Sequence, residues 1–248
     1  MSPQTLLAEA GGRGLALFLD YDGTLTPIVE RPEDAVLDER TRDAVRLLAS
    51  RHAVAVVSGR DLEDLRMRVG IEGLAYAGSH GFDIEGPGVR RVQEASPALQ
   101  AAAAELEHET AALPGVQVER KRFAVSLHYR RARAGDVPAL DAAVERALAR
   151  HAGLRRTGGK KIFELRPDVD WDKGHAVLWL IEALGLQACL PVYIGDDLTD
   201  EDAFRALEGK GVGVCVQAAP RPTAARYSLP DPAAVRELLA ALAGAPRT

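Results

Sequence analysis

The sequence predicts an α/β fold in which a parallel sheet is interrupted by a second, α+β domain. Short apolar runs at 15–19 and 53–57 are typical of buried strands in a parallel sheet. Between them, residues 38–50 have apolar positions at helical spacing and acidic residues at the start, which completes a strand–helix–strand unit. The strands expected within 97–170 instead alternate polar and apolar residues, as at 123–129, so one face of their sheet is expected to contact solvent.

The other expected helices and strands continue this division along the chain. In the parallel-sheet part they are a helix at 61–69, a strand at 74–77, a hairpin-like stretch at 85–88, a helix at 173–184, a strand at 190–194, a helix at 200–207, a strand at 212–216 and a helix at 231–242. In the inserted part they are a helix at 97–112, strands at 116–120 and 123–129, a helix at 136–152, and strands at 154–157 and 161–166. These assignments predict a core domain made of 1–94 and 170–248, and an inserted domain at 95–169.

With 248 residues, a formal charge of −5 and 47% apolar residues, the chain has the composition of a globular protein. Its apolar runs are far shorter than the ~20 residues needed to cross a bilayer, so we expect no membrane-spanning helix and no membrane partner. The first residues lack the basic start and apolar stretch of a secretory signal, and we therefore expect a cytoplasmic protein. Cys189 and Cys215 lie in apolar segments, which favours buried thiols over a disulfide or a sulfur-bound metal.

The charge is divided unevenly between the two parts. Residues 116–170 hold 13 Lys and Arg against 7 Asp and Glu, a balance of +6 that leaves −11 for the rest of a chain whose total is −5. A basic region of this kind fits an anionic ligand, a solvated face or a nucleic-acid surface. Its aromatic rings are too few for a base-stacking platform, so we expect no nucleic-acid partner.

Two carboxylates follow the first strand. Residues two apart on an extended chain point to the same side, so Asp20 and Asp22 are expected to face one spot. In open parallel sheets, ligands bind outside the carboxyl ends of the strands, and this is where both residues lie. Gly23 and Thr24 then allow a sharp turn. Because Asp-Gly is also a common turn signal, a purely structural role is the alternative.

The second strand is followed by a hydroxyl group and by backbone amides at a helix start. Ser58, Gly59 and Arg60 precede Asp61 there, in the kind of place where backbone amides bind phosphate oxygens. The alternative is that Ser58 or Asp61 only caps the helix.

Acidic residues gather after the strand at 190–194. Residues 195–202 hold five acids; Asp196 and Asp197 stand at the strand end, whereas the later ones suit a helix N-terminus. Clustered carboxylates at a strand end suit Mg²⁺. Lys173 opens an earlier helix, where a cation opposes the helix dipole, and neutralising carboxylates and phosphate in a shared site would explain this position. The alternative is an ordinary exposed lysine.

These signals occur in a fixed order: Asp-x-Asp after the first strand, Ser after the second, Lys before a later helix and Asp-Asp after the next strand. This combination resembles the haloacid dehalogenase (HAD) superfamily of phosphotransferases, which implies a Rossmann-like parallel-sheet core. The resemblance implies that Asp20 is the nucleophile, that Asp22 is the general acid and base, and that Ser58 and Lys173 hold the phosphate. It also implies a Mg²⁺ site formed by Asp20, the carbonyl of Asp22 and Asp196, with Asp197 and Asp200 as auxiliary ligands.

The inserted domain resembles the caps that close over the active site in this superfamily. Its order of helices and strands is that of the α+β cap with an open-faced sheet, called C2-type. Within the insert, segments 119–130 and 158–167, together with 195–204 of the core, are similar to trehalose-6-phosphate phosphatases. The resemblance implies a set of substrate-binding residues, namely Gly59, Arg60, His80, Lys121, His128, Arg130, Lys161, Glu164 and Arg166.

The activity implied by the resemblance is Mg²⁺-dependent hydrolysis of trehalose 6-phosphate to trehalose and phosphate through an aspartyl-phosphate. We expect a monomer whose partner is a small sugar phosphate. One alternative is another sugar-phosphate phosphatase of the same superfamily, acting on sucrose 6-phosphate or a glycosyl-phosphoglycerate. A second alternative is a non-catalytic sensor that binds sugar phosphate and Mg²⁺.

Overall fold

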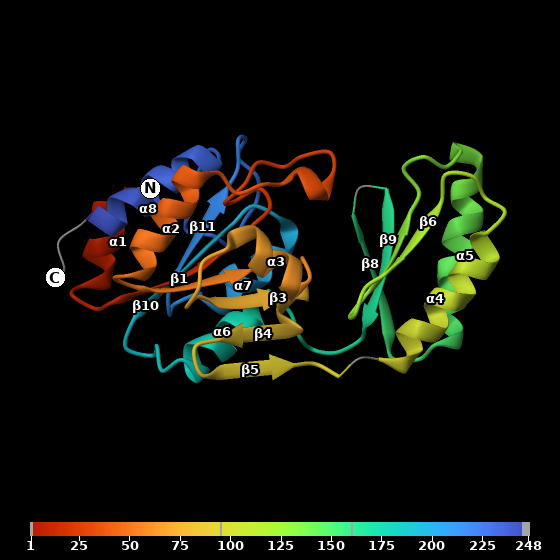
Figure 1. Cartoon of the computed structure of the whole chain (residues 1–248), viewed down its shortest axis with the longest axis horizontal. Helices are drawn as coiled ribbons and strands as arrows, with labels where there is room; N and C mark the ends of the chain where they lie inside the picture. Colours follow the sequence, from red (N-terminus) through yellow and green to blue (C-terminus); the bar gives the residue numbers. More distant parts are fainter. Residues whose placement is uncertain (1, 95, 160, 245–248) are drawn as a thin grey trace. The chain divides into compact units, whose positions relative to one another are not determined.

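The computed structural model describes residues 2–94, 96–159 and 161–244 and divides the chain into two compact units (Figure 1). Unit 1 comprises Met1–Val92 and Trp171–Thr248, and unit 2 comprises Gln93–Asp170. Unit 2 is therefore an insertion into unit 1, and its ends lie within two residues of the predicted boundaries. Each unit has its own apolar core.

Unit 1 is built on an eight-stranded sheet in the order β12-β11-β10-β1-β2-β3-β4-β5. The strands are β1 (Leu15–Leu19), β2 (Ala53–Val57), β3 (Ala75–Gly78), β4 (Asp83–Gly86), β5 (Val89–Val92), β10 (Leu190–Gly195), β11 (Val212–Val216) and β12 (Tyr227–Leu229). The six from β12 to β3 are parallel, and β4 and β5 continue the sheet antiparallel. The central strands are buried on both faces, which explains their continuous apolar runs.

Helices cover both faces of this sheet. They are α1 (Pro3–Ala10), α2 (Glu39–Ala49), α3 (Leu62–Val69), α6 (Lys173–Ala183), α7 (Glu201–Ala206) and α8 (Pro232–Gly244). Because successive strand residues point to opposite faces, Leu17 of β1 packs with α1, α2, α3 and α8, whereas Phe18 packs with α6 and α7. Within the part of the chain that the structure describes, no helix combines the length and apolar character needed to span a bilayer.

The strand order of the sheet reverses at β1, because later strands are added on both sides of it. β2 and β3 add on one side of it, and β10, β11 and β12 add on the other. Ligands of such sheets bind outside the carboxyl ends of the strands at this point. The topology therefore brings the residues that follow β1, β2 and β10 to one edge of the sheet.

Unit 2 is a four-stranded antiparallel sheet in the order β6-β7-β9-β8, with two helices (Figure 1). Its elements are α4 (Pro97–Thr110), β6 (Gln117–Arg120), β7 (Val125–His128), α5 (Val137–Arg150), β8 (Leu154–Gly159) and β9 (Ile162–Pro167). The helices pack on the face that carries Leu127 and Phe163. Ser126 and Glu164 alternate with these residues and lie on the other face, which neither α4 nor α5 covers. The predicted fold class, an α/β core with an inserted open-faced α+β domain, is confirmed.

An α-helix and a strand of unit 1 are absent from the sequence-based prediction. Helix α1 has eight residues and begins with a proline after the N-cap Ser2, so it offers few turns of apolar periodicity. Strand β12 has only three residues and is held by its parallel pairing with β11. In unit 2, the strand predicted at 123–129 is shorter because Lys121 N bonds the carbonyl oxygen of Ala124, which closes a turn.

Candidate active site

The carboxyl end of β1 places Asp20 in the interior of unit 1, where its side chain is nearly inaccessible. Its backbone N donates to the carbonyl oxygen of Ile194 in β10 (2.9 Å), so the parallel ladder continues one residue beyond β1. The chain then turns, and Gly23 N donates to the carbonyl oxygen of Thr26 (2.8 Å). Gly23 has a φ of 86°, and a Cβ there would lie 2.1 Å from Asp196 Oδ2. Glycine is therefore required for this close approach of the two strand ends.

A buried lysine joins the acidic residues. Lys173, the first residue of α6, is 3% exposed, and its Nζ donates to Asp20 Oδ1 (2.7 Å) and to Asp200 Oδ1 (2.6 Å). Burial alone would lower the pKa of Lys173, but the two carboxylates outweigh burial and raise it, so the ammonium group stays charged. These carboxylates explain why a cation is tolerated at a helix N-terminus.

Asp200 is completely buried, and its two oxygens accept four hydrogen bonds. Oδ1 accepts from Lys173 Nζ and from the hydroxyl of Tyr193 (2.6 Å). Oδ2 accepts from the backbone N of Asp196 and of Asp197, both at 2.9 Å. Asp200 therefore fixes both the lysine and the turn that follows β10.

The carboxylates at this edge form a compact cluster. Oxygens of Asp20, Asp196 and Asp200 lie within 4.8 Å of one another. Burial raises the pKa of Asp196 to about 7, with the charges of Asp200 and Asp197 adding to the effect. Burial also raises the pKa of Asp20 well above its usual range, against the opposing charge of Lys173. Three carboxylates beside one ammonium group carry two excess negative charges when ionised, and this donor set fits a divalent cation with oxygen ligands.

The loop after β2 brings three predicted residues together. Ser58 is 1% exposed, and its Oγ accepts from the backbone N of Arg60 (3.2 Å). A Cβ at Gly59 would lie 2.6 Å from His80 Nε2, so glycine lets the histidine ring pack on this loop. His80 has a φ of 58°, and its backbone N donates to the carbonyl oxygen of Ser58 (2.8 Å). The segment after β3 is thereby tied to the loop after β2.

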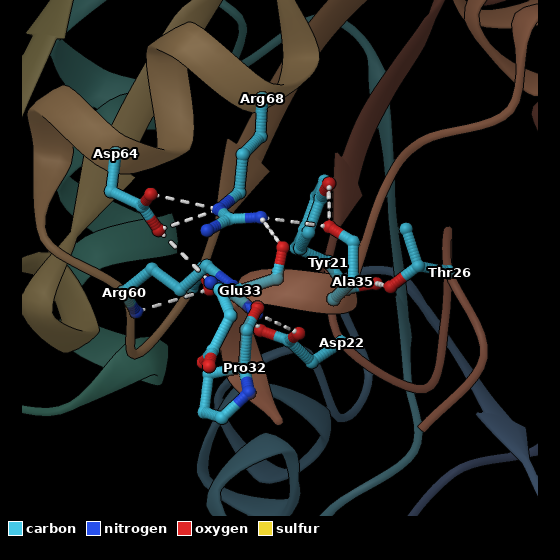
Figure 2. A network of polar contacts seen from close by, with 10 residues as sticks. Tyr21, Asp22, Thr26, Pro32, Glu33, Ala35, Arg60, Asp64 and Arg68 are labelled. Atoms are coloured by element: carbon cyan, nitrogen blue, oxygen red, sulfur yellow. Dashed lines mark hydrogen bonds and ion pairs between the residues drawn. The ribbon is translucent and has the colours of Figure 1, made fainter. Parts of the chain in front are cut away.

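Asp22 contacts Arg60 and is not part of the carboxylate cluster. Arg60 Nε and Nη2 donate to its two oxygens at 2.7 and 2.6 Å (Figure 2). The expectation that Asp20 and Asp22 face one spot stays a prediction. The chain turns after Asp20, and the guanidinium group on the neighbouring loop offers two donors in the geometry that a carboxylate prefers.

A second polar cluster lies on the face of the unit 2 sheet opposite the helices, which we call the open face. Its members are Glu119, Lys121, Ser126, His128, Glu164 and Arg166. Glu164 accepts from Ser126 Oγ (2.7 Å) and Arg166 Nε (2.5 Å). Burial alone would raise the pKa of Glu164, but Arg166, Lys121 and Ser126 outweigh burial and lower it. The cluster thus holds an ionised carboxylate.

The other contacts of the open face involve its edge strand β6. Lys121 Nζ lies 3.7 Å from Glu164 Oε2 and 3.8 Å from Glu119 Oε2, and His128 Nε2 lies 2.8 Å from Glu119 Oε2. The remaining predicted residues of unit 2 lie in exposed turns. Arg130 follows β7, and Lys161 lies between β8 and β9 with a φ of 63°.

Several polar residues of these two clusters were missed by sequence reasoning. Ser126 had a usable signal, because its alternation with Val125 and Leu127 puts it on the same face as His128. No sequence signal indicated a role for Tyr193, since a tyrosine within an apolar strand is usually an ordinary core residue. Its buried hydroxyl becomes meaningful only once the contact with Asp200 is known.

The sequence model of the trehalose-phosphatase family matches residues 18–233 of this chain. The chain belongs to the trehalose-phosphatase family. A trehalose-phosphate phosphatase of Mycobacterium tuberculosis is 46% identical over 239 residues, which cover 92% of this chain and 61% of that protein. A trehalose 6-phosphate phosphatase of Zea mays is 40% identical over 262 residues, covering 97% of this chain and 73% of the maize protein. This family member therefore spans about three fifths of the length of its mycobacterial relative.

Solved structures of trehalose-phosphatases have the same fold. The C-terminal domain of the Candida albicans trehalose-6-phosphate phosphatase matches with a TM-score of 0.80 and 27% identity, covering 98% of this chain and 97% of that one. The Aspergillus fumigatus enzyme matches with a TM-score of 0.68 and 32% identity, covering 98% of each chain. A haloacid dehalogenase-like hydrolase from Bacteroides thetaiotaomicron shares the fold at 16% identity, with a TM-score of 0.68 and coverage of 92% and 98%. This member of the trehalose-phosphatase family therefore has the HAD fold.

Proposed function

We propose that this chain is a Mg²⁺-dependent phosphatase that hydrolyses trehalose 6-phosphate to trehalose and phosphate. The observation that carries the proposal is the buried contact of Lys173 with Asp20 at the carboxyl end of β1, beside Asp196. A carboxylate attacks phosphorus efficiently only when its charge and that of the phosphate are offset. The 46% identity with a trehalose-phosphate phosphatase supports the choice of substrate.

Mg²⁺ would be held by the carboxylates of Asp20 and Asp196, with the backbone carbonyl of Asp22 as a further ligand. Asp200 suits a positioning role better, because its oxygens already accept four hydrogen bonds. The side chain of Asp197 accepts from Leu198 N (2.7 Å) and caps the following turn. When bound, the ion offsets the negative charge of the cluster and orients the phosphate.

Four residues of unit 1 act in the two steps of hydrolysis, which are transfer of the phosphoryl group to Asp20 and its release to water. Lys173 and Ser58 hold the phosphate oxygens while Asp20 attacks phosphorus, and the bond from phosphorus to the sugar oxygen breaks. Asp22 donates a proton to that oxygen, which releases trehalose and leaves an aspartyl-phosphate on Asp20. Asp22 then takes a proton from the water that attacks the phosphorus, and phosphate leaves. Catalysis consists mainly of positioning and charge neutralisation.

We assign recognition of the sugar to unit 2. A disaccharide offers many hydroxyl groups and little apolar surface, so charged side chains that make directional hydrogen bonds suit it. The open face supplies Lys121, His128, Glu164 and Arg166, and the neighbouring turns supply Arg130 and Lys161. We further propose that the protein acts as a cytoplasmic monomer.

The first test is phosphate release from a panel of trehalose 6-phosphate, sucrose 6-phosphate, glucose 6-phosphate and glucosyl-3-phosphoglycerate, with Mg²⁺ and with excess chelator. We expect metal-dependent release mainly from trehalose 6-phosphate, and loss of release in Asp20→Asn. Preference for another sugar phosphate would support the proposed phosphatase reaction but reject trehalose 6-phosphate as the substrate. No release from any of the four by folded protein would favour the sensor alternative.

The second test separates sugar recognition from chemistry. Glu164→Ala should cripple hydrolysis of trehalose 6-phosphate and spare hydrolysis of p-nitrophenyl phosphate. The matched control is Glu145→Ala, which removes an exposed carboxylate of the same unit that pairs with Arg156 on the opposite side of the sheet. Equal losses on both substrates would reject the assignment of Glu164 to the sugar.

A further inference from the structure

A network of charged side chains joins helix α3 to the turn after β1 (Figure 2). Arg60 is its centre. Besides its two bonds to Asp22, Arg60 donates from Nη1 to Asp64 Oδ2 (2.9 Å) and from Nη2 to the carbonyl oxygen of Pro32 (2.8 Å). Four hydrogen bonds therefore fix the orientation of a guanidinium group whose side chain is only 11% exposed.

Asp64 is itself held by Arg68, one helical turn further along α3. Arg68 Nε lies 2.8 Å from both oxygens of Asp64, and its Nη1 donates to the carbonyl oxygens of Glu33 (3.2 Å) and Ala35 (3.1 Å). Burial alone would raise the pKa of Asp64, but hydrogen bonds from Arg68 and Arg60 outweigh burial and lower it. Asp64 is thus an ionised carboxylate shared by two guanidinium groups.

The loop between β1 and α2 is the third member of the network. The guanidinium carbon of Arg60 lies 5.3 Å from the ring centroid of Tyr21, and the Tyr21 hydroxyl donates to the carbonyl oxygen of Ala35 (3.0 Å). Arg60 and Arg68 bind the carbonyl oxygens of the same loop. The turn that carries Asp22 and the loop that follows it are therefore held by Arg60, just before α3, and by Arg68 on α3.

We infer that Asp64 and Arg68 are positioning residues for proton transfer: they hold Arg60, and Arg60 holds the carboxyl group of Asp22 in one orientation, whether it is ionised or carries the proton that it transfers. The inference rests on the proposed function, in which Asp22 protonates the leaving oxygen. Proton transfer requires a donor within about 2.6–3.2 Å of its acceptor, and a misplacement of about 1 Å can cost about 100-fold in rate. Asp64 and Arg68 need not touch the substrate to affect this step.

The inference predicts a loss that depends on the leaving group. The alkoxide of a sugar leaves poorly without a proton, so its release needs the general acid in place. p-Nitrophenolate is a stable anion and leaves without a proton. A fault confined to the orientation of Asp22 should therefore slow phosphoryl transfer from trehalose 6-phosphate and spare the first transfer from p-nitrophenyl phosphate.

The test is a single-turnover measurement of both substrates with Mg²⁺ and the full chain. In Asp64→Asn, which keeps the size of the side chain and removes its charge, we expect transfer from trehalose 6-phosphate to fall about tenfold, a part of the ~10²–10⁴ that general acid catalysis supplies. The burst of p-nitrophenolate should stay within about twofold of the wild type. Asp43→Asn, which removes an exposed carboxylate paired with Arg46 on α2, should leave both unchanged.

Arg68→Lys is the second variant, because it keeps the charge on α3 but cannot bridge Asp64 and the loop carbonyls. It should show the same substrate-selective loss and keeps the test informative if Asp64→Asn unfolds. Equal losses on both substrates, as a purely structural role would give, overturn the inference, and so does the absence of any loss. A wild-type protein that releases no phosphate from trehalose 6-phosphate would refute the proposed function itself.

Discussion

Replacing Asp196 with asparagine should stabilise unit 1 at alkaline pH when no divalent cation is present. The pKa of Asp196 is raised from its usual 3.8 to about 7, so its proton binds more tightly to the folded protein than to the unfolded chain. That contribution to stability is fully present below pH 3.8 and is lost as the pH rises through about 7. The difference between the two pKa values, at about 1.4 kcal/mol for each pH unit, is about 4 kcal/mol.

The expected advantage of Asp196→Asn in the free energy of unfolding is therefore about 2 kcal/mol at about pH 5.5 and about 4 kcal/mol at about pH 8.5. Urea denaturation followed by tryptophan fluorescence measures it for unit 1 alone, because both tryptophans, Trp171 and Trp179, lie in that unit. Added Mg²⁺ should stabilise the wild type and have little effect on the variant.

Asp43→Asn, an exposed acid on α2, serves as the matched control and should show no pH-dependent gain. Equal stability of wild type and Asp196→Asn at about pH 8.5, in the presence of chelator, would refute the reasoning that burial and the neighbouring carboxylates disfavour the charge of Asp196. A difference in the free energy of unfolding that does not change with pH would refute it too, since better packing would stabilise the variant equally at every pH.

Three further predictions concern single contacts. Lys173→Met should lower phosphate release from both trehalose 6-phosphate and p-nitrophenyl phosphate by about 10²–10³-fold, because it removes the cation at the phosphate; the exposed Lys210→Met should not. Tyr193→Phe deletes a hydroxyl from the buried carboxylate that holds this lysine, and urea denaturation should show a loss of about 1–3 kcal/mol; unchanged stability would mean that the hydrogen bond contributes little. Ser126→Ala removes a hydrogen bond from Glu164 and should raise KM for trehalose 6-phosphate several-fold without changing kcat for p-nitrophenyl phosphate; a change in that kcat would contradict a role confined to the sugar.

Much of the fold of unit 1 could be predicted because its central strands are continuous apolar runs that are followed by polar residues. Strands β1, β2 and β11 have the predicted ends, since burial on both faces leaves little choice of residue. Strand β12 and helix α1 could not be predicted, because they owe their structure to neighbours that pack against them and not to local periodicity.

The part of the candidate site that is formed by the ends of neighbouring strands could be predicted from the sequence. Asp20 and Asp196 follow strands that are neighbours in the sheet, so topology alone brings them together. The pairing of Asp22 with Arg60 could not be foreseen, because it depends on the side-chain directions of two loops that lie 38 residues apart in sequence. The contact of Asp64 with Arg60 was hidden for a similar reason, since an acidic residue on a helix surface is usually solvated.

Unit 2 is a separate module inserted into the chain of unit 1. Arg91 and Trp171 stand at the two points where the chain leaves and re-enters unit 1, and the guanidinium carbon of Arg91 lies 3.5 Å from the ring centroid of Trp171. A segment with its own core and neighbouring ends can be exchanged as a cassette without rethreading the sheet that receives it. Under the proposed function, unit 2 could therefore be replaced to change the sugar that is bound, while the proposed phosphate site at the end of β1 stays the same.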